Sequence, residues 1–249
     1  METRSAEPVS VRLGDRTIRL FPQADGSKLG LMPLSGIHKI GVESLDLLDA
    51  SGRVVESQKL TVRSGGFASQ NVEMTKSLTE LKAKPGDAEA MNAFRTRVTD
   101  GRHWLEPFGP PVSGCMVSPY GVRRLHNGKS TGNYHSGIDS RGASGTPVKA
   151  VAAGVVRLAR PFEVSGNTVG VDHGQGLLSL YMHLSNFAVQ DGAVVDKGSV
   201  IGYVGTTGRS TAPHLHWSIM ANGIGVNPAQ WIAMKSCYPP PARRKSSKN

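Results

Sequence analysis

The sequence predicts a mostly β protein built from two domains. Its 249 residues are enough for one large domain or two ordinary ones. The 30 glycines and 15 prolines favour turns, and β-branched runs that suit short strands lie between them. The character of the sequence changes near Trp104, where prolines and aromatic residues cluster up to Pro111. We therefore expect a first domain at 1–103, a second at 104–238, and a disordered basic tail at 239–249.

The first domain contains short alternating segments. Residues 9–13 and 17–20 alternate apolar and polar side chains at period two, as a half-buried strand does. A turn at 49–52 separates two further apolar runs and indicates a hairpin. The exception is 87–98, whose apolar residues have helical spacing, with Asp87 as the expected N-cap. These signals predict a small β-sandwich with one short helix.

The second domain shows strands punctuated by glycine. The apolar runs are short, and turn residues separate them at intervals typical of an antiparallel β protein. We expect a compact antiparallel β-domain with strands within 146–158, 167–172, 177–183, 194–204 and 214–220.

The chain is strongly basic. Its formal charge of +10 results from 29 basic and 19 acidic residues, and it favours anionic partners such as nucleic acid, lipid headgroups or cell-wall polymers. No Arg-rich helix or basic strand interleaved with aromatics supports nucleic acid. No run reaches the roughly 18 apolar residues that a membrane helix needs. Residues 1–8 lack the apolar core of a secretory signal.

The two cysteines, Cys115 and Cys237, do not form a Cys-x-x-Cys pair, which excludes a thiolate zinc site. They lie near the two ends of the second domain. Because domain termini are often neighbours, we expect these cysteines to be close in space. The pattern leaves two interpretations open: one disulfide bridge, or two unrelated small apolar side chains.

A His-x-His pair lies within the expected strand at 214–220. Because side chains alternate faces along a strand, His214 and His216 point to one side, whereas Leu215 and Trp217 point to the other and can enter the core. Two imidazoles on one face can share a metal ion. Alternatively, one can bind the ion while the other faces a substrate.

A second phrase supplies His135 and, four positions later, Asp139. Gly137 between them permits a bend that brings both side chains to one ion. Zinc accepts imidazole nitrogen and carboxylate oxygen, and a catalytic zinc keeps three protein ligands plus an open position. One imidazole from the His-x-His pair and these two side chains match that number.

Taken together, the two phrases resemble the signatures of the LytM/lysostaphin family of zinc endopeptidases, His-x-x-x-Asp and His-x-His. The resemblance covers about residues 107 to 232. The surrounding phrases that match are Pro119–Arg123, Gly145–Val148, Ala153–Val156, Asp172–Gly174, Tyr181–Ser185 and Gly205–Gly208.

The resemblance implies a division of roles among five side chains. His135, Asp139 and His216 would hold one zinc ion per chain, and His183 and His214 would be the unliganded catalytic pair. No His-Glu-x-x-His motif supplies a glutamate base, and neutral imidazole has a suitable pKa range for that task. Which of the two histidines is the base stays open.

The resemblance also implies a substrate and a location. The family cuts peptides of bacterial peptidoglycan, either in glycine-rich bridges or next to a D-amino acid, so the expected location is the cell envelope or the extracellular space. The first domain resembles, less closely, the immunoglobulin-like β-sandwich that precedes the catalytic domain in some members. It would either cover the zinc site or extend the groove, and we favour extension because no early side chain is marked as a fourth ligand.

Three other functions agree with single features of the sequence. The chain could be an inactive wall-binding or hydrolase-activating module, although relatives of that kind replace zinc ligands and all ligands remain here. It could bind nucleic acid, which only the charge suggests. It could cleave sugars, although no paired carboxylates are marked. Among the remaining histidines we expect His173 to be structural, and we assign no role to the others.

Overall fold

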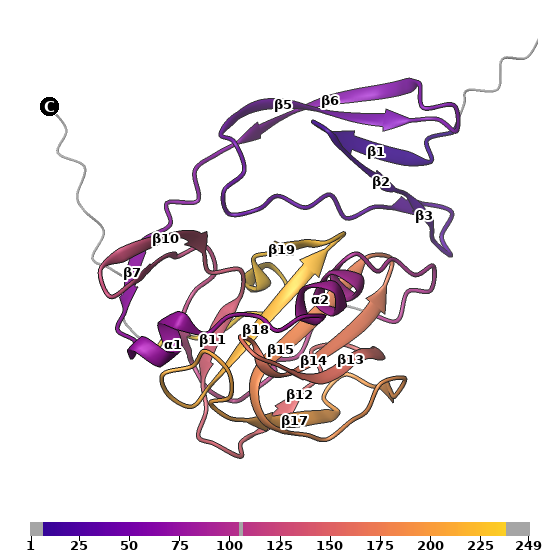
Figure 1. The fold of residues 1–249 in the computed structure, drawn as a ribbon. Coiled ribbons are helices and arrows are strands. Elements are labelled where there is room, and N and C mark those ends of the chain that lie inside the picture. Colours follow the sequence, from indigo (N-terminus) through magenta and orange to yellow (C-terminus); the bar gives the residue numbers. More distant parts are fainter. Residues whose placement is uncertain (1–6, 105–106, 238–249) are drawn as a thin grey trace, which may run out of the picture.

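The computed structural model describes residues 7–104 and 107–237, and it is dominated by antiparallel strands, as predicted (Figure 1). The predicted tail at 239–249 and most of the N-terminal segment lie outside the described residues. In the first hundred residues the elements are β1 (Ser10–Leu13), β2 (Arg16–Arg19), β3 (Phe21–Pro22), β4 (Lys28–Leu29), β5 (Gly41–Leu48), β6 (Val54–Val62), β7 (Ser69–Val72), α1 (Lys76–Glu80) and α2 (Asp87–Arg95).

Most of the remaining strands form a large ten-stranded sheet, whereas β9 and β10 join β7 in a three-stranded sheet. Its main path runs β16-β13-β14-β15-β18-β11-β8, with β12, β17 and β19 paired beside it. The elements are β8 (Met116–Ser118), β9 (Arg123–His126), β10 (Lys129–Tyr134), β11 (Ile138–Arg141), β12 (Pro147–Lys149), β13 (Gly154–Phe162), β14 (Gly166–Gly174), β15 (Leu177–Phe187), β16 (Val194–Val195), β17 (Val200–Val204), β18 (His214–Ala221), β19 (Ile224–Val226) and the 3-10 turn η1 (Pro228–Gln230).

Strand β18 shows why the two faces of the large sheet differ. Leu215, Trp217 and Ile219 are fully buried in the main core. The alternate residues face the other side, where Met220 packs in a smaller cluster beneath α2. His214 and His216 have the same parity as Met220, so they lie on the α2 side of the sheet. The predicted alternation is therefore confirmed, and it separates the core from the functional face.

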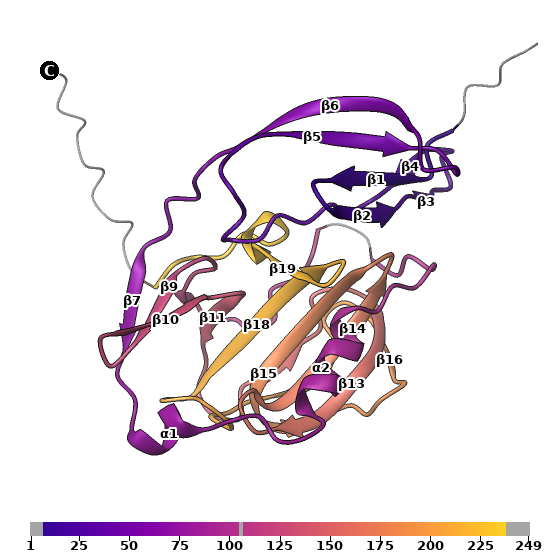
Figure 2. The same ribbon diagram turned by 45° about the horizontal axis from the view of Figure 1, so that its top comes forward.

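Helix α2 packs on one face of the large sheet, although it lies within the first hundred residues of the chain (Figure 2). Phe94 is 2 % exposed and packs against β13, β15 and β18. The predicted N-cap was wrong by one residue: Gly86 occupies the cap with a left-handed φ of 83°. The Asp87 carboxylate instead accepts backbone N–H bonds from Lys84 and Glu163, which ties the helix start to the β13–β14 turn.

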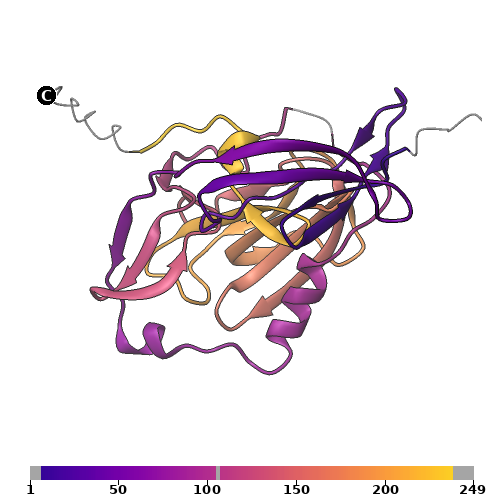
Figure 3. The same ribbon diagram turned by 90° about the horizontal axis from the view of Figure 1, so that it is seen from above.

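The small sheet has the order β2-β1-β5-β6 and lies over one end of the large sheet (Figure 3). It docks through the segment that follows β4. Leu29 and Leu31 pack against the main core, and Asn222 donates from its side chain to the Leu31 carbonyl at 2.8 Å. The described strands before β7 form this sheet and the β3–β4 ribbon, so the sandwich and the boundary at 103/104 stay predictions.

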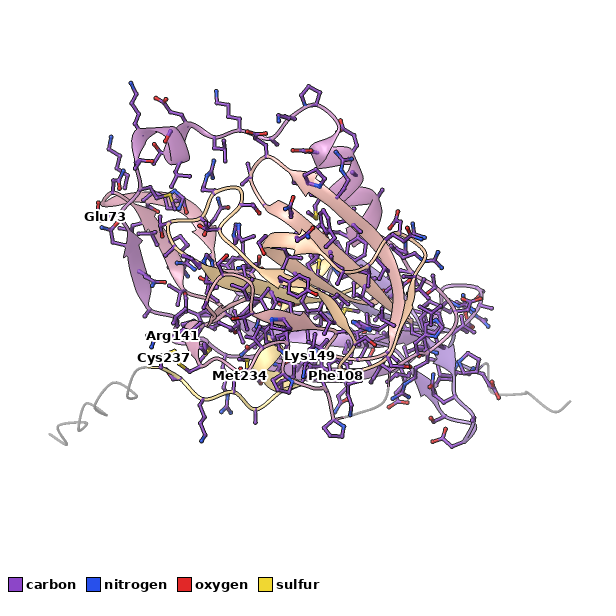
Figure 4. All side chains as sticks on the ribbon, turned by 90° about the horizontal axis from the view of Figure 1, so that it is seen from below. Glu73, Phe108, Arg141, Lys149, Met234 and Cys237 are labelled. Carbon is purple, nitrogen blue, oxygen red and sulfur yellow. A yellow bond between two sulfur atoms is a disulfide. The ribbon has the colours of Figure 1, made fainter. Side chains whose placement is uncertain are left out.

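The expected proximity of the two cysteines is confirmed, because Cys115 and Cys237 form a disulfide. The bridge ties the end of the described chain to the segment before β8. The backbone N–H of Arg141 donates to the Cys115 carbonyl at 2.9 Å, and Arg141 and Cys237 lie close together (Figure 4). The disulfide therefore braces the edge of the large sheet at β8, next to β11.

Candidate metal centre

Two neighbouring strands bring three predicted ligands together. β11 pairs antiparallel with β18, and the register places Asp139 directly opposite His216. His135 lies in the turn before β11, and this turn places its ring on the same face of the sheet as Asp139 and His216. Gly137 allows this turn, because a Cβ there would lie 2.3 Å from the Trp217 carbonyl oxygen. His216 thus joins two side chains that lie about 80 residues before it in the sequence.

The ligand atoms nearly touch. His135 Nε2 lies 2.9 Å from His216 Nδ1, and both nitrogens lie within 3.0 Å of Asp139 Oδ1. Tetrahedral zinc with bonds of about 2.0 Å separates its ligands by about 3.3 Å, so only a small expansion would admit an ion. The three residues are at most 9 % exposed.

The tautomer of His135 supports a cation at this point. Its Nδ1 lies 2.9 Å from the Pro119 carbonyl oxygen, which can only accept, so Nδ1 carries the proton. In the neutral ring Nε2 then carries a lone pair, which faces Asp139 Oδ1 at 3.0 Å. Two electron-rich atoms at this distance repel each other unless a positive charge lies between them. The donor set therefore fits a metal ion, and nitrogen with carboxylate oxygen suits zinc.

Burial and neighbouring charge act against each other at Asp139. Desolvation pushes the pKa of this carboxyl upward, but His135 and His216 outweigh it and hold the pKa well below the ordinary value. Burial lowers the pKa of His216, against the pull of Asp139. The carboxylate is thus ionised and His216 is neutral near pH 7, which are the protonation states that a metal ion requires.

The other two predicted residues, His183 and His214, lie beside the ligands with their ring centroids 5.1 Å apart. Each donates its Nδ1 proton to a backbone carbonyl at 2.8 Å, His183 to Thr207 and His214 to Ala212. In the neutral ring this bond selects the tautomer with its proton on Nδ1, so that Nε2 is the atom that can accept a proton. Burial also lowers the pKa of His183 to about 3.

A local distortion aims His183. Its φ is +61°, a left-handed value that is uncommon for a residue with a side chain. The register between β14 and β15 shifts by one residue beside it, which marks a bulge. Such strained positions concentrate at functional sites, and here the bulge turns the imidazole toward His214 and His216.

These side chains lie in a cavity of about 610 Å³ with a basic lining. Arg124, Arg141 and Arg209 line it, and Asp139 is the sole carboxylate among the described lining residues. Arg209 is held by the carbonyls of Leu78 in α1 and of Leu81, which follows the helix. The cavity is therefore an open groove suited to an extended, anionic ligand.

Sequence reasoning missed Arg124 and Gln70. Arg124 donates to Asp139 Oδ2 at 2.7 Å, and Gln70 accepts from Arg124 at 2.8 Å. Neither residue has a spacing that relates it to a ligand, because the contact depends on pairing between distant strands. His173 is structural as expected: it is fully buried, and its ring nitrogens bond to the Ala153 carbonyl and Ser179.

The fold and the site define a β protein with a cluster of side chains that could hold a metal ion, and two further imidazoles lie beside it. Residues 133–228 match the model of peptidase family M23. A crystal structure of a Pseudomonas aeruginosa protein assigned to peptidase M23 is 31% identical, with a TM-score of 0.67, and the match covers 92% of this chain and 88% of that one. The chain belongs to peptidase family M23.

Two curated relatives match the second half of the chain. The DD-carboxypeptidase/endopeptidase Mpg of Neisseria meningitidis serogroup B is 44% identical over 133 residues, covering 52% of this chain and 30% of the relative. Lysostaphin of Staphylococcus simulans is 41% identical over 101 residues, covering 40% of this chain and 20% of the relative. The matched segment thus spans less than a third of either relative, and the predicted family resemblance is confirmed.

Proposed function

We propose that this protein is a zinc-dependent endopeptidase that hydrolyses the peptide part of bacterial peptidoglycan. One observation carries the proposal: His135, Asp139 and His216 bring their ligand atoms within 4.8 Å of one another, beside two imidazoles with free Nε2 atoms. These three side chains would hold one zinc ion per chain. All five predicted residues are present, which favours an active enzyme over an inactive wall-binding or activating module.

The division of chemistry follows from the residues. Zinc, when bound, supplies Lewis acidity toward a peptide carbonyl and makes a nucleophile available at neutral pH. His183 and His214 would transfer protons, one as general base and the other as donor to the oxyanion or the leaving amine. Their carbonyl-bonded Nδ1 atoms fix the tautomer that the general base needs, and the ring that acts as donor must first receive a proton at Nε2.

The groove supports a substrate with carboxylates. Three guanidinium groups line it, and Arg141 is exposed on β11, two residues after Asp139. Stem peptides with a direct diaminopimelate cross-link carry free carboxylates, whereas glycine bridges carry none. The name of the Neisseria relative also refers to DD-peptide chemistry. We therefore favour the D-amino-acid cross-link over the glycine bridge.

The proposed location is the cell envelope or the extracellular space, where this substrate lies. A disulfide between Cys115 and Cys237 agrees with an oxidising compartment. Anionic wall polymers would be secondary partners of the basic surface. Among the described residues, no helix is long and apolar enough to cross a membrane.

The test combines metal analysis with mass spectrometry of fragments from two defined walls, one with glycine bridges and one with direct diaminopimelate cross-links. We expect one zinc per chain and new amines from the directly cross-linked wall. New reducing ends would identify a sugar-cleaving enzyme instead. A metal-loaded protein that releases nothing from either wall would contradict the proposed activity.

A further inference from the structure

Strand β7 forms one wall of the groove, although it lies outside the residues that match the family model. Gln70, Val72 and Met74 all line the cavity. Their spacing of two is that of a strand that turns one face to the groove. The segment that connects the small sheet to the helices therefore supplies side chains to the metal-binding face.

The position of Gln70 is set by backbone pairing. β7 runs parallel to β9, and the register places Gln70 opposite Arg124. The Gln70 Oε1 atom accepts two hydrogen bonds at 2.8 Å, one from Arg124 and one from the Ser118 hydroxyl. A single amide oxygen thus holds two side chains that both face the metal position.

Arg124 carries this contact to the ligand. Its second terminal nitrogen donates to Asp139 Oδ2 at 2.7 Å, and the two side chains are 16 % and 12 % exposed. The outer oxygen of the carboxylate is therefore occupied, and Oδ1 is left to face His135 and His216. A planar guanidinium that binds at both ends of its fork cannot rotate without breaking one of these bonds.

We propose that Gln70 and Arg124 are positioning residues that set the metal affinity of the site, so that β7 completes the metal centre. Partners that orient a ligating carboxylate raise metal affinity because the ligand needs no rearrangement before binding. Without Gln70, one arm of the half-buried guanidinium loses its acceptor, and Arg124 moves toward water and away from Asp139. The inference rests on the proposed function only in that the site binds a metal ion.

The experiment measures the zinc affinity of the full chain by competition with a chromogenic chelator. Gln70→Leu removes the acceptor and should weaken zinc binding about 10- to 100-fold, as loss of such outer partners does. Gln70→Glu keeps an acceptor for both donors and should restore affinity close to that of the unsubstituted chain. The matched control is Gln58→Leu, the same change at an exposed position of β6, which should leave affinity unchanged.

A spectroscopic measurement separates positioning from general damage. Cobalt-loaded Gln70→Leu should show an altered visible absorption spectrum, whereas thermal unfolding of its metal-free form should stay near that of Gln58→Leu. Arg124→Lys is a second variant that keeps the charge but not the fork, and it should weaken zinc binding in the same way.

Unchanged zinc affinity in both Gln70→Leu and Arg124→Lys would overturn the inference. An equal loss in Gln58→Leu would overturn it as well, because the effect would not depend on the groove. A chain that binds no zinc before any substitution would instead refute the metal site of the proposed function. A chain that binds zinc but leaves walls intact would refute the proposed activity and leave the role of Gln70 standing.

Discussion

The small sheet and the large sheet of the molecule differ sharply in burial. None of the 9 residues of β6, at the edge of the small sheet, is buried. In β15, at the centre of the large sheet, 7 of 11 residues are buried. The small sheet is a single layer that is attached to the large sheet by the packing of a few side chains. The large sheet, in contrast, has packed side chains on both faces. The candidate ligands Asp139 and His216 lie on the large sheet, where packing fixes rotamers and strand register, and His135 lies in the turn beside it.

The largest expected effect comes from replacing one aspartate in each sheet and comparing the two variants. Asp139→Ala should abolish stoichiometric zinc binding and hydrolysis, because two imidazoles alone form a weak site. Asp46→Ala in the small sheet removes bonds to Arg12, Ser44 and Ser57 and should leave the metal untouched. Metal analysis and wall digestion of both variants check this. Full zinc occupancy in Asp139→Ala would exclude that side chain as a ligand.

Within the large sheet, a second pair of substitutions separates metal binding from proton transfer. His183→Ala and His214→Ala should keep zinc but lose about a hundred- to ten-thousand-fold in turnover, as loss of a general acid or base does. Zinc content and turnover on a soluble cross-linked peptide are measured for each variant. A metal-free variant would show that the residue is a ligand and that the division of roles is wrong.

The buried interior of the large sheet also predicts a pH dependence of stability. Burial lowers the pKa of His173 to about 4, from an ordinary value of 6.5. The unfolded chain therefore binds this proton first as the pH falls. The free energy of unfolding does not depend on this group above about pH 6.5. It falls by about 1.4 kcal/mol per pH unit as the pH drops from there toward pH 4.

Chemical denaturation of the metal-free protein at pH 7 and pH 5 measures this effect. His173→Gln should reduce the slope, because glutamine offers polar atoms without a titrating ring, and the lowered pKa values of His183 and His216 account for the remainder. The same slope in the substituted and unsubstituted chains would assign the pH dependence to other groups.

The smallest expected effect concerns the segment that connects the small sheet to the large sheet, and two shortened chains test it. A chain that starts at residue 64 lacks the small sheet but keeps β7 and α2, and it should bind zinc with unchanged affinity. A chain that starts at residue 104 lacks both elements and should bind zinc about 10- to 100-fold more weakly, because Arg124 loses Gln70. Equal zinc affinity in the two shortened chains would show that β7 is dispensable for the metal centre.

The local sequence determined much of this protein. Alternation in residues 214–220 places two imidazoles on one face and Trp217 in the core, because strand geometry has a fixed period of two. The glycines indicated the turns, and the His-x-x-x-Asp and His-x-His motifs indicated the side chains that gather in the candidate metal centre. The distant position of the two cysteines at the domain ends indicated a contact that the disulfide confirms.

Only the tertiary structure decided which distant strands meet. The contact of Gln70 with Arg124 depends on the register of β7 on β9. The contact of Arg124 with Asp139 depends on the position of β9 beside β11. Helix α2 likewise has helical spacing in the sequence, but nothing local says that Phe94 packs on the large sheet. Periodicity is a local property, whereas contacts between separated segments follow from the free energy of the whole packed chain.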